Sequence, residues 1–296
     1  MKLLVLISVV VAAIVFADAR PRVGTVPAAL WAAASLLASA LVAPLYLLTR
    51  PSRAQAWGLL EVLALTLFFA TTVPLAAAWI HIPAGVAPPL GIIAVLAVIQ
   101  NAVFAAAAVY VVHVKYRLPL AAVGLTVGAW AQRIRQGAIA AAAGIVGNSA
   151  GQNATLLALG AWMGRAAAND LVMREEARAP VYRLLPRLHQ PVEIAVIAVL
   201  VGVVVPIGEE IFFRGLVFGA LRRRMNLHTA VLLSALFFSA AHLEPIEFLP
   251  IMLLGVVLAY AYDRTGSLVP GMIAHGVNNL AALFFFYYQG LPPSPP

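Results

Sequence analysis

The sequence predicts an all-α, polytopic transmembrane helical bundle, and three features of the chain support this fold class. Hydrophobic residues make up 63% of the 296 residues and charged residues only 10%, which is far from the composition of a soluble domain. The apolar residues form runs of about 20, the length at which a helix crosses the hydrocarbon core of a membrane. Most Lys and Arg residues lie in short connections between these runs, which is typical of membrane orientation and not of nucleic-acid binding.

Nine apolar runs follow one another along the chain. They are Met1–Ala19, Ala28–Leu48, Leu59–Ile80, Leu90–Val114, Ala138–Met163, Val192–Leu221, Thr229–Leu243, Phe248–Tyr262 and Leu268–Tyr288. The first run is short and ends in small residues, so it fits either a retained span or a cleaved signal peptide. We therefore expect eight to nine spans in a multi-pass integral membrane protein.

The polar connection before Val192 divides the chain into a membrane region at 1–190 and a membrane core at 191–290. A Pro-rich tail at 291–296 is expected to be disordered. The run Ala138–Met163 contains polar and small residues, which leaves a broken helix open. Its segment Gly147–Gly151 matches G-x-S-x-G, but that motif presents a nucleophilic serine only between a strand and a helix. Close helix packing is the favoured interpretation.

The stretch Gly208–Gly215 places Glu209, Glu210 and Arg214 beside an apolar run. A charge inside a membrane helix costs between about 2.5 and 17 kcal/mol depending on how it is measured, so three charges together indicate a functional site. Glu210 and Arg214 are four residues apart and can pair on one helix face. Glu209 is turned about 100° away and is free to face another element.

Polar residues recur at helical spacing on two later apolar runs, as Phe238 with His242 and His275 with Asn279. Glu209, His242 and His275 form a ligand set suited to a catalytic Zn²⁺ with one open position. Without a metal, Glu209 would act as a general base toward water, with His or Asn donors stabilising the oxyanion. Both routes lead to peptide-bond hydrolysis, and the sequence does not choose between them. The chain has no cysteine, which excludes thiol nucleophiles and thiolate ligands.

Three spaced signatures resemble those of the CAAX protease and bacteriocin-processing (CPBP) family of intramembrane proteases. They are E-E-x-x-x-R at Glu209–Arg214, F-x-x-x-H at Phe238–His242 and H-x-x-x-N at His275–Asn279. The resemblance covers Val192–Tyr288, about a third of the chain. It implies a four-helix catalytic core in the carboxyl-terminal third, preceded by a variable membrane region, in a cytoplasmic membrane of prokaryotic type.

The resemblance also implies an endopeptidase that acts near the carboxyl end of a membrane-associated protein or peptide; prenylated CAAX substrates are known for eukaryotic members. Glu209 and His242 would activate water. His275 and Asn279 would stabilise the oxyanion or help bind a metal. Glu210, Arg214 and Phe238 would be structural or orienting residues.

Two other classes of function compete with this interpretation. One is a non-catalytic membrane partner or bacteriocin-immunity protein, in which the polar residues only support binding. The other is a proton-coupled transporter, since buried Glu and His side chains can relay protons. Transporters usually carry internal repeats, whereas the polar residues here concentrate in one half of the chain.

Overall fold

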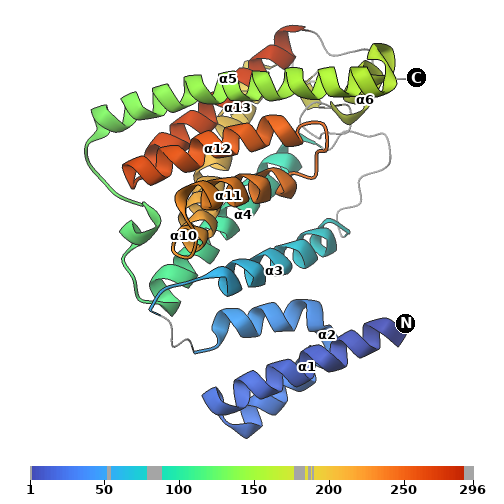
Figure 1. Cartoon of the computed structure of the whole chain (residues 1–296), viewed down its shortest axis with the longest axis vertical. Helices are drawn as coiled ribbons and strands as arrows, with labels where there is room; N and C mark the ends of the chain where they lie inside the picture. Colours follow the sequence, from blue (N-terminus) through green and yellow to red (C-terminus); the bar gives the residue numbers. More distant parts are fainter. Residues whose placement is uncertain are drawn as a thin grey trace. The chain divides into compact units, whose positions relative to one another are not determined.

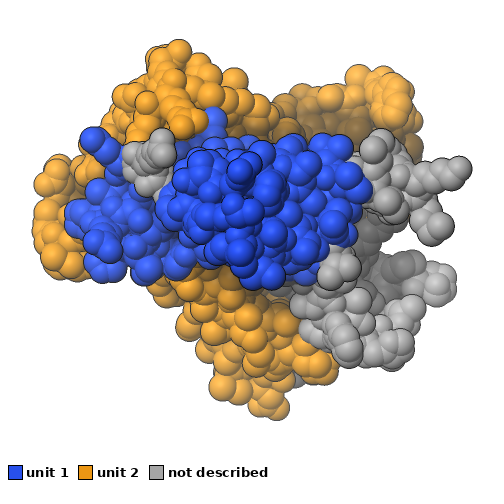
Figure 2. All heavy atoms as spheres, turned by 90° about the horizontal axis from the view of Figure 1, so that it is seen from below, with its two compact units in different colours: residues 1–81, 109–119 blue, residues 82–108, 120–296 orange. Residues whose placement is uncertain are grey.

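The structure is a computed structural model that describes residues 2–51, 55–78, 89–176, 184–185, 188 and 190–289. Regular secondary structure in these ranges is entirely helical, as predicted. A helix satisfies its backbone hydrogen bonds internally, so apolar segments in a membrane take this form. The chain divides into two compact units, coloured separately in Figure 2: residues 1–81 with 109–119, and residues 82–108 with 120–296.

Each predicted span corresponds to a helix or to a series of joined helices (Figure 1). The elements are α1 (Lys2–Val23), α2 (Thr25–Thr49), α3 (Leu59–Ala78), α4 (Leu90–Val109), the π-helix η1 (Tyr110–Lys115), the 3₁₀ helix η2 (Leu120–Val123), α5 (Trp130–Met163), α6 (Arg165–Glu176), α8 (Pro191–Val199), the π-helix η4 (Leu200–Val204), α9 (Val205–Glu209), the π-helix η5 (Glu210–Phe218), α10 (Gly219–Arg222), α11 (Leu227–Ala241), α12 (Phe248–Thr265) and α13 (Val269–Gln289).

Three helices of the described chain are long and apolar enough to cross a membrane, namely Leu90–Lys115, Pro191–Arg222 and Phe248–Thr265. Shorter apolar helices lie within α2, α3, α11 and α13. These features support an integral membrane protein, while the number of eight to nine spans stays a prediction. The predicted tail at 291–296 lies outside the described residues.

Two ionic clusters join helices within the first unit. The carboxylate of Asp18 accepts hydrogen bonds from three side chains, Arg22, Tyr46 and Arg50. Glu61 accepts from Lys115 Nζ at 2.9 Å, from the Tyr116 hydroxyl at 2.6 Å and from a backbone N–H at 3.0 Å. These buried or half-buried charges are stable because each meets its donors within the same unit.

In the second unit, α5 is one continuous helix of 34 residues, so the broken helix that the sequence left open does not occur. Its glycines let it pack closely on α12 and α13 (Figure 1). A Cβ on Gly144 would lie 2.6 Å from Asn278 Nδ2, and one on Gly151 would lie 2.7 Å from the Pro250 backbone. Ser149 lies exposed in the middle of this continuous helix and not on a turn that could present a nucleophile. The close contacts of the glycines agree with the interpretation of helix packing.

Helix α13 crosses the helix formed by α8, η4 and α9 at a pair of glycines. A Cβ on Gly276 would collide with the backbone carbonyl oxygen of Gly202. This crossing holds the part of α13 that carries His275 and Asn279 against the helix that carries Glu209. The close approach is therefore a structural requirement of the site described below.

Substitution of Gly276 by alanine is expected to destabilise the protein by about 1–3 kcal/mol, because the clashing atom belongs to the backbone and cannot rotate away. Thermal unfolding in detergent measures this change. Gly91→Ala is the matched control, since a Cβ there has no neighbour within 4 Å. Alanine is favoured over glycine in a helix by up to about 1 kcal/mol, so the control should not lose stability. Equal midpoints for the two variants would contradict the prediction.

Candidate active site

The second unit brings three of the predicted polar side chains, those of Glu209, Glu210 and Arg214, together beside the imidazole of His275. Glu210 Oε1 lies 3.2 Å from His275 Nδ1 and 2.9 Å from Arg214 Nη1. Glu209 Oε2 lies 3.8 Å from the other ring nitrogen, Nε2. Glu210 and Arg214 are fully buried, and Glu209 is 8% exposed. The site is therefore a buried ionic cluster carried by α9, η5 and α13.

The contacts of His275 define the direction of its two nitrogens. A carboxylate can only accept a hydrogen bond, so the contact with Glu210 assigns the ring proton to Nδ1. This leaves Nε2 facing Glu209. A carboxylate that accepts a hydrogen bond from one ring nitrogen fixes the tautomer and the orientation of a histidine whose other nitrogen takes part in the chemistry. Glu210 thus orients His275.

The sequence predicted separate contacts for the two glutamates, and the structure contains only part of that separation. The ion pair of Glu210 with Arg214 is present, but Glu210 also contacts His275, where the sequence suggested Glu209 alone. Both carboxylates reach one imidazole because its two nitrogens face different sides of the ring. The chain also changes from α-helix to the wider π-helix at Glu210, directly after Glu209.

Phe238 lies at the centre of the site and touches both imidazole rings. Its ring centroid is 4.8 Å from that of His242 and 5.6 Å from that of His275, and the guanidinium of Arg214 lies 4.2 Å from it. His242 Nδ1 is 2.8 Å from the Phe238 carbonyl oxygen, so this nitrogen carries the proton and Nε2 keeps its lone pair. Among the described side chains, His242 makes no hydrogen bond with Glu209 or Glu210.

Asn279 bonds to the helix that carries the glutamates. Its Nδ2 donates to the Val201 carbonyl oxygen at 2.9 Å. In the π-helix η4 the N–H of Val205 bonds to Leu200, five residues back, so the next residue would bond to Val201. That residue is Pro206, which has no N–H. The Asn279 amide replaces the missing donor, and its second N–H stays available.

The neighbouring Asn278 has a separate role that spacing alone did not reveal. It is buried, and its Nδ2 lies 3.3 Å from the Ala141 carbonyl oxygen of α5 and 2.8 Å from that of Ala274. Asn278 therefore joins α13 to α5, while Asn279 joins α13 to η4.

Residues 191–281 match the family described as type II CAAX prenyl endopeptidase Rce1-like. Over these residues the chain is similar to that family, and we call residues 191–281 the Rce1-like segment. All seven predicted site residues fall within it. The match agrees with the CPBP resemblance and is confined to the carboxyl-terminal part of the chain.

Two curated relatives align with parts of the chain. One is named "Putative membrane peptidase YdiL", from Bacillus subtilis (strain 168), and is 35% identical over 78 residues. The other is named "UPF0177 protein YxdF", from Lactococcus lactis subsp. lactis (strain IL1403), and is 28% identical over 82 residues. The alignments cover 26% and 27% of this chain and span only 32% and 45% of the relatives' own lengths. No solved structure matches the chain.

The donor set expected for Zn²⁺ is not assembled in the Rce1-like segment. Among the residues that the structure describes, no three His, Asp or Glu side chains are placed to hold a metal ion. Glu209 and His275 face each other, whereas His242 makes no ion pair or hydrogen bond with Glu209 or Glu210 among the described residues. We therefore derive no catalytic step through a metal.

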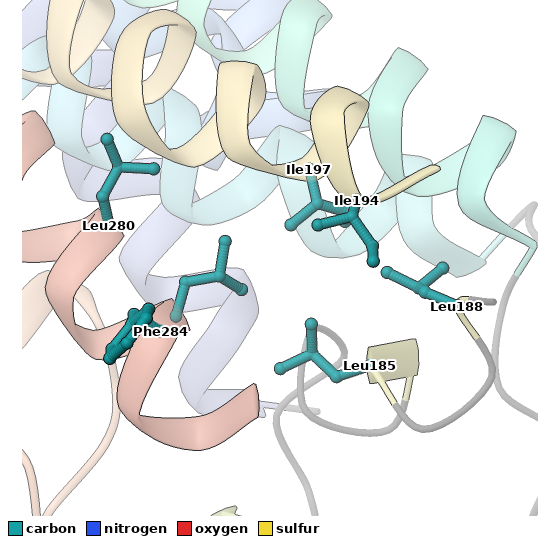
Figure 3. Close-up of a pocket in the computed structure, with 7 residues that line it drawn as sticks. Leu185, Leu188, Ile194, Ile197, Leu280 and Phe284 are labelled. Carbon is teal, nitrogen blue, oxygen red and sulfur yellow. The ribbon is translucent and has the colours of Figure 1, made fainter. Parts of the chain in front are cut away.

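An apolar cavity of about 450 Å³ lies between the Rce1-like segment and the residues just before it (Figure 3). Its walls come from α8, from α13 and from the short segment before α8. They consist of Leu185, Leu188, Ile194, Ile197, Leu280, Leu283 and Phe284. Leu280 directly follows Asn279 in the sequence, so the cavity and the polar site share helix α13.

Proposed function

We propose that this chain is an intramembrane endopeptidase that hydrolyses a peptide bond near the carboxyl end of a membrane-associated protein or peptide. One observation carries the proposal: inside a segment that matches a family of prenyl endopeptidases, the buried carboxylate of Glu209 faces Nε2 of His275, and its Oε2 has no hydrogen-bond partner among the described residues. A buried, incompletely paired charge costs stability, so its presence in a membrane helix favours a chemical role.

The first step uses Glu209 as general base. Its carboxylate accepts a proton from a water molecule, and the resulting hydroxide attacks the carbonyl carbon of the peptide bond. His242 assists because its Nε2 lone pair accepts a hydrogen bond from the same water. The oxyanion that forms is stabilised by the second N–H of Asn279.

The proton then moves through His275. At 3.8 Å from Glu209, Nε2 is the nearest basic group, and the imidazolium that forms is stabilised by Glu210 on its other side. This cation donates to the oxyanion and then gives the proton to the leaving amine nitrogen as the C–N bond breaks. Arg214 balances the charge of Glu210, and Phe238 fixes both rings.

Cleavage of a defined peptide tests the proposal. The purified chain, in lipid nanodiscs, is mixed with a peptide ending in a prenylated CAAX sequence, and the products are identified by mass spectrometry. We expect a peptide shortened at its carboxyl end. Unprenylated CAAX and hydrophobic transmembrane peptides complete the panel. If every peptide stays intact with folded protein, the proposal is wrong; binding without cleavage would favour a partner role, and proton-dependent flux across vesicles would favour a transporter.

We also expect peptide cleavage to survive removal of metal ions, since the described His, Asp and Glu side chains form no three-donor group. The measurement is the initial rate before and after treatment with 1,10-phenanthroline, together with elemental analysis of the protein. Loss of activity on chelation, recovered by added Zn²⁺ at one metal per chain, would contradict this prediction and favour the zinc route.

A further inference from the structure

Helix α4 lies outside the Rce1-like segment yet contacts it through one polar residue. Only Asn101 and Ala108 of this helix are buried, and Asn101 is 4% exposed. Apart from Asn101 and its exposed neighbour Gln100, α4 is apolar and mostly exposed. A buried amide in such a helix calls for a reason beyond membrane insertion, because polar residues in membrane helices are costly.

Asn101 packs against the glycine that precedes Glu209. A Cβ on Gly208 would lie 2.6 Å from the Cβ of Asn101 and 2.8 Å from its Cα, so no larger residue fits there. One turn later, Phe104 stacks on Phe212 with centroids 4.8 Å apart and planes at 16°. The two contacts lie on either side of the glutamate pair, so α4 supports the helix directly at Glu209.

The hydrogen bonds of Asn101 differ from those of a residue that joins two helices. Its Nδ2 donates to the Ala97 carbonyl oxygen of its own helix at 2.8 Å, and no N–H or O–H of the described part of the chain donates to its Oδ1. An unpartnered buried acceptor costs about 1–3 kcal/mol, which an apolar side chain of the same size would avoid. The atom nearest to the place of the missing Gly208 Cβ is this oxygen, so a Cα–H group of Gly208 faces it.

We propose that Asn101 is a positioning residue for Glu209. Its amide fixes the backbone of Gly208, and thereby the direction in which the Glu209 carboxylate leaves the helix toward His275. A shift of about 1 Å in a catalytic group can cost about 100-fold in rate. The cleavage part of the test rests on the proposed function; the labelling part does not.

The experiment compares the parent with Asn101→Leu, which keeps the number and branching of the side-chain heavy atoms and removes the amide. Gln100→Leu is the matched control, since Gln100 is the exposed neighbour on the same helix. The first readout is the rate at which a hydrophobic carbodiimide modifies Glu209, measured by peptide mass spectrometry without any substrate. The second is kcat and KM on the prenylated CAAX peptide. The thermal unfolding midpoint shows whether each variant is folded.

For Asn101→Leu we expect an unfolding midpoint at or above that of the parent, a changed labelling rate at Glu209, and a kcat reduced about 10- to 100-fold with KM nearly unchanged. Gln100→Leu should match the parent in all three. Parent-like labelling and kcat in folded Asn101→Leu would overturn the inference. A drop in the unfolding midpoint large enough to explain the lower rate by partial unfolding would overturn it too. If Asn101→Leu does not fold, Asn101→Ala decides by the same measurements. A changed labelling rate, with no peptide cleaved by the parent, would refute the proposed function and leave Asn101 as a positioning residue.

Discussion

Replacing Glu209 with glutamine is expected to reduce peptide cleavage by about 10²- to 10⁴-fold, the usual contribution of a general base. Glutamine keeps the size of the side chain but cannot take a proton from water. The fold should be retained, because the closest ring nitrogen to the Glu209 carboxylate among the described residues, Nε2 of His275, is 3.8 Å away, beyond hydrogen-bond distance. The measurement is the initial cleavage rate at saturating peptide, together with the thermal unfolding midpoint.

Asp170→Asn is the matched control, because it removes a carboxylate that lies outside the candidate site. Its side chain is 60% exposed on α6 and pairs with Arg174, so its removal should leave the rate unchanged. Parent-like cleavage by folded Glu209→Gln would show that the carboxylate is not the base. Retained binding or immunity in that variant would then point to the non-catalytic partner.

Arg214→Met is expected to destabilise the protein by about 3–5 kcal/mol, the cost of leaving a buried charge without its partner. The Arg214–Glu210 pair is 0% exposed on both sides, and methionine would leave the Glu210 carboxylate uncompensated. Chemical or thermal unfolding in detergent gives the change. Arg222→Met is the matched control, because its pair with Asp263 is 43% and 23% exposed. Exposed pairs contribute only about 0–1 kcal/mol.

A double variant separates stability from orientation of the histidine. Replacing Glu210 by leucine together with Arg214→Met removes both charges, and apolar replacement of a buried pair is often neutral or stabilising. Stability should therefore recover. Activity should not, because Nδ1 of His275 loses the acceptor that holds it. A stable and fully active double variant would contradict the orienting role of Glu210.

Features that depend on one helix at a time could be predicted from the sequence. The lengths of the apolar runs predicted helices that the structure contains, because a membrane leaves the backbone no other partner than itself. The four-residue spacing predicted that Glu210 and Arg214 can pair, and they do. Both predictions follow from local geometry.

Features that depend on how two helices meet could not be predicted. The contact of Glu210 with His275 requires Gly271, where a Cβ would lie 2.6 Å from Glu210 Oε2. The different partners of Asn278 and Asn279 depend on which carbonyl oxygens face α13. One local signal existed: Pro206 removes a backbone donor, so a carbonyl oxygen one turn earlier needs a side-chain partner. Asn101 gave no signal, since it lies more than 100 residues before the signatures.

The π-helix η5 has a consequence for the number of residues that this helix needs after the glutamates. Nine residues, Glu210–Phe218, follow a five-residue hydrogen-bond step, so each turn holds more chain than an α-helical turn of 3.6 residues. Loss of one residue after Gly215 would let the end of this segment tighten into α-helix and leave the glutamates and Arg214 where they are. A variant of this chain that lacks one residue between Leu216 and Arg222 is therefore expected to keep the same ionic cluster.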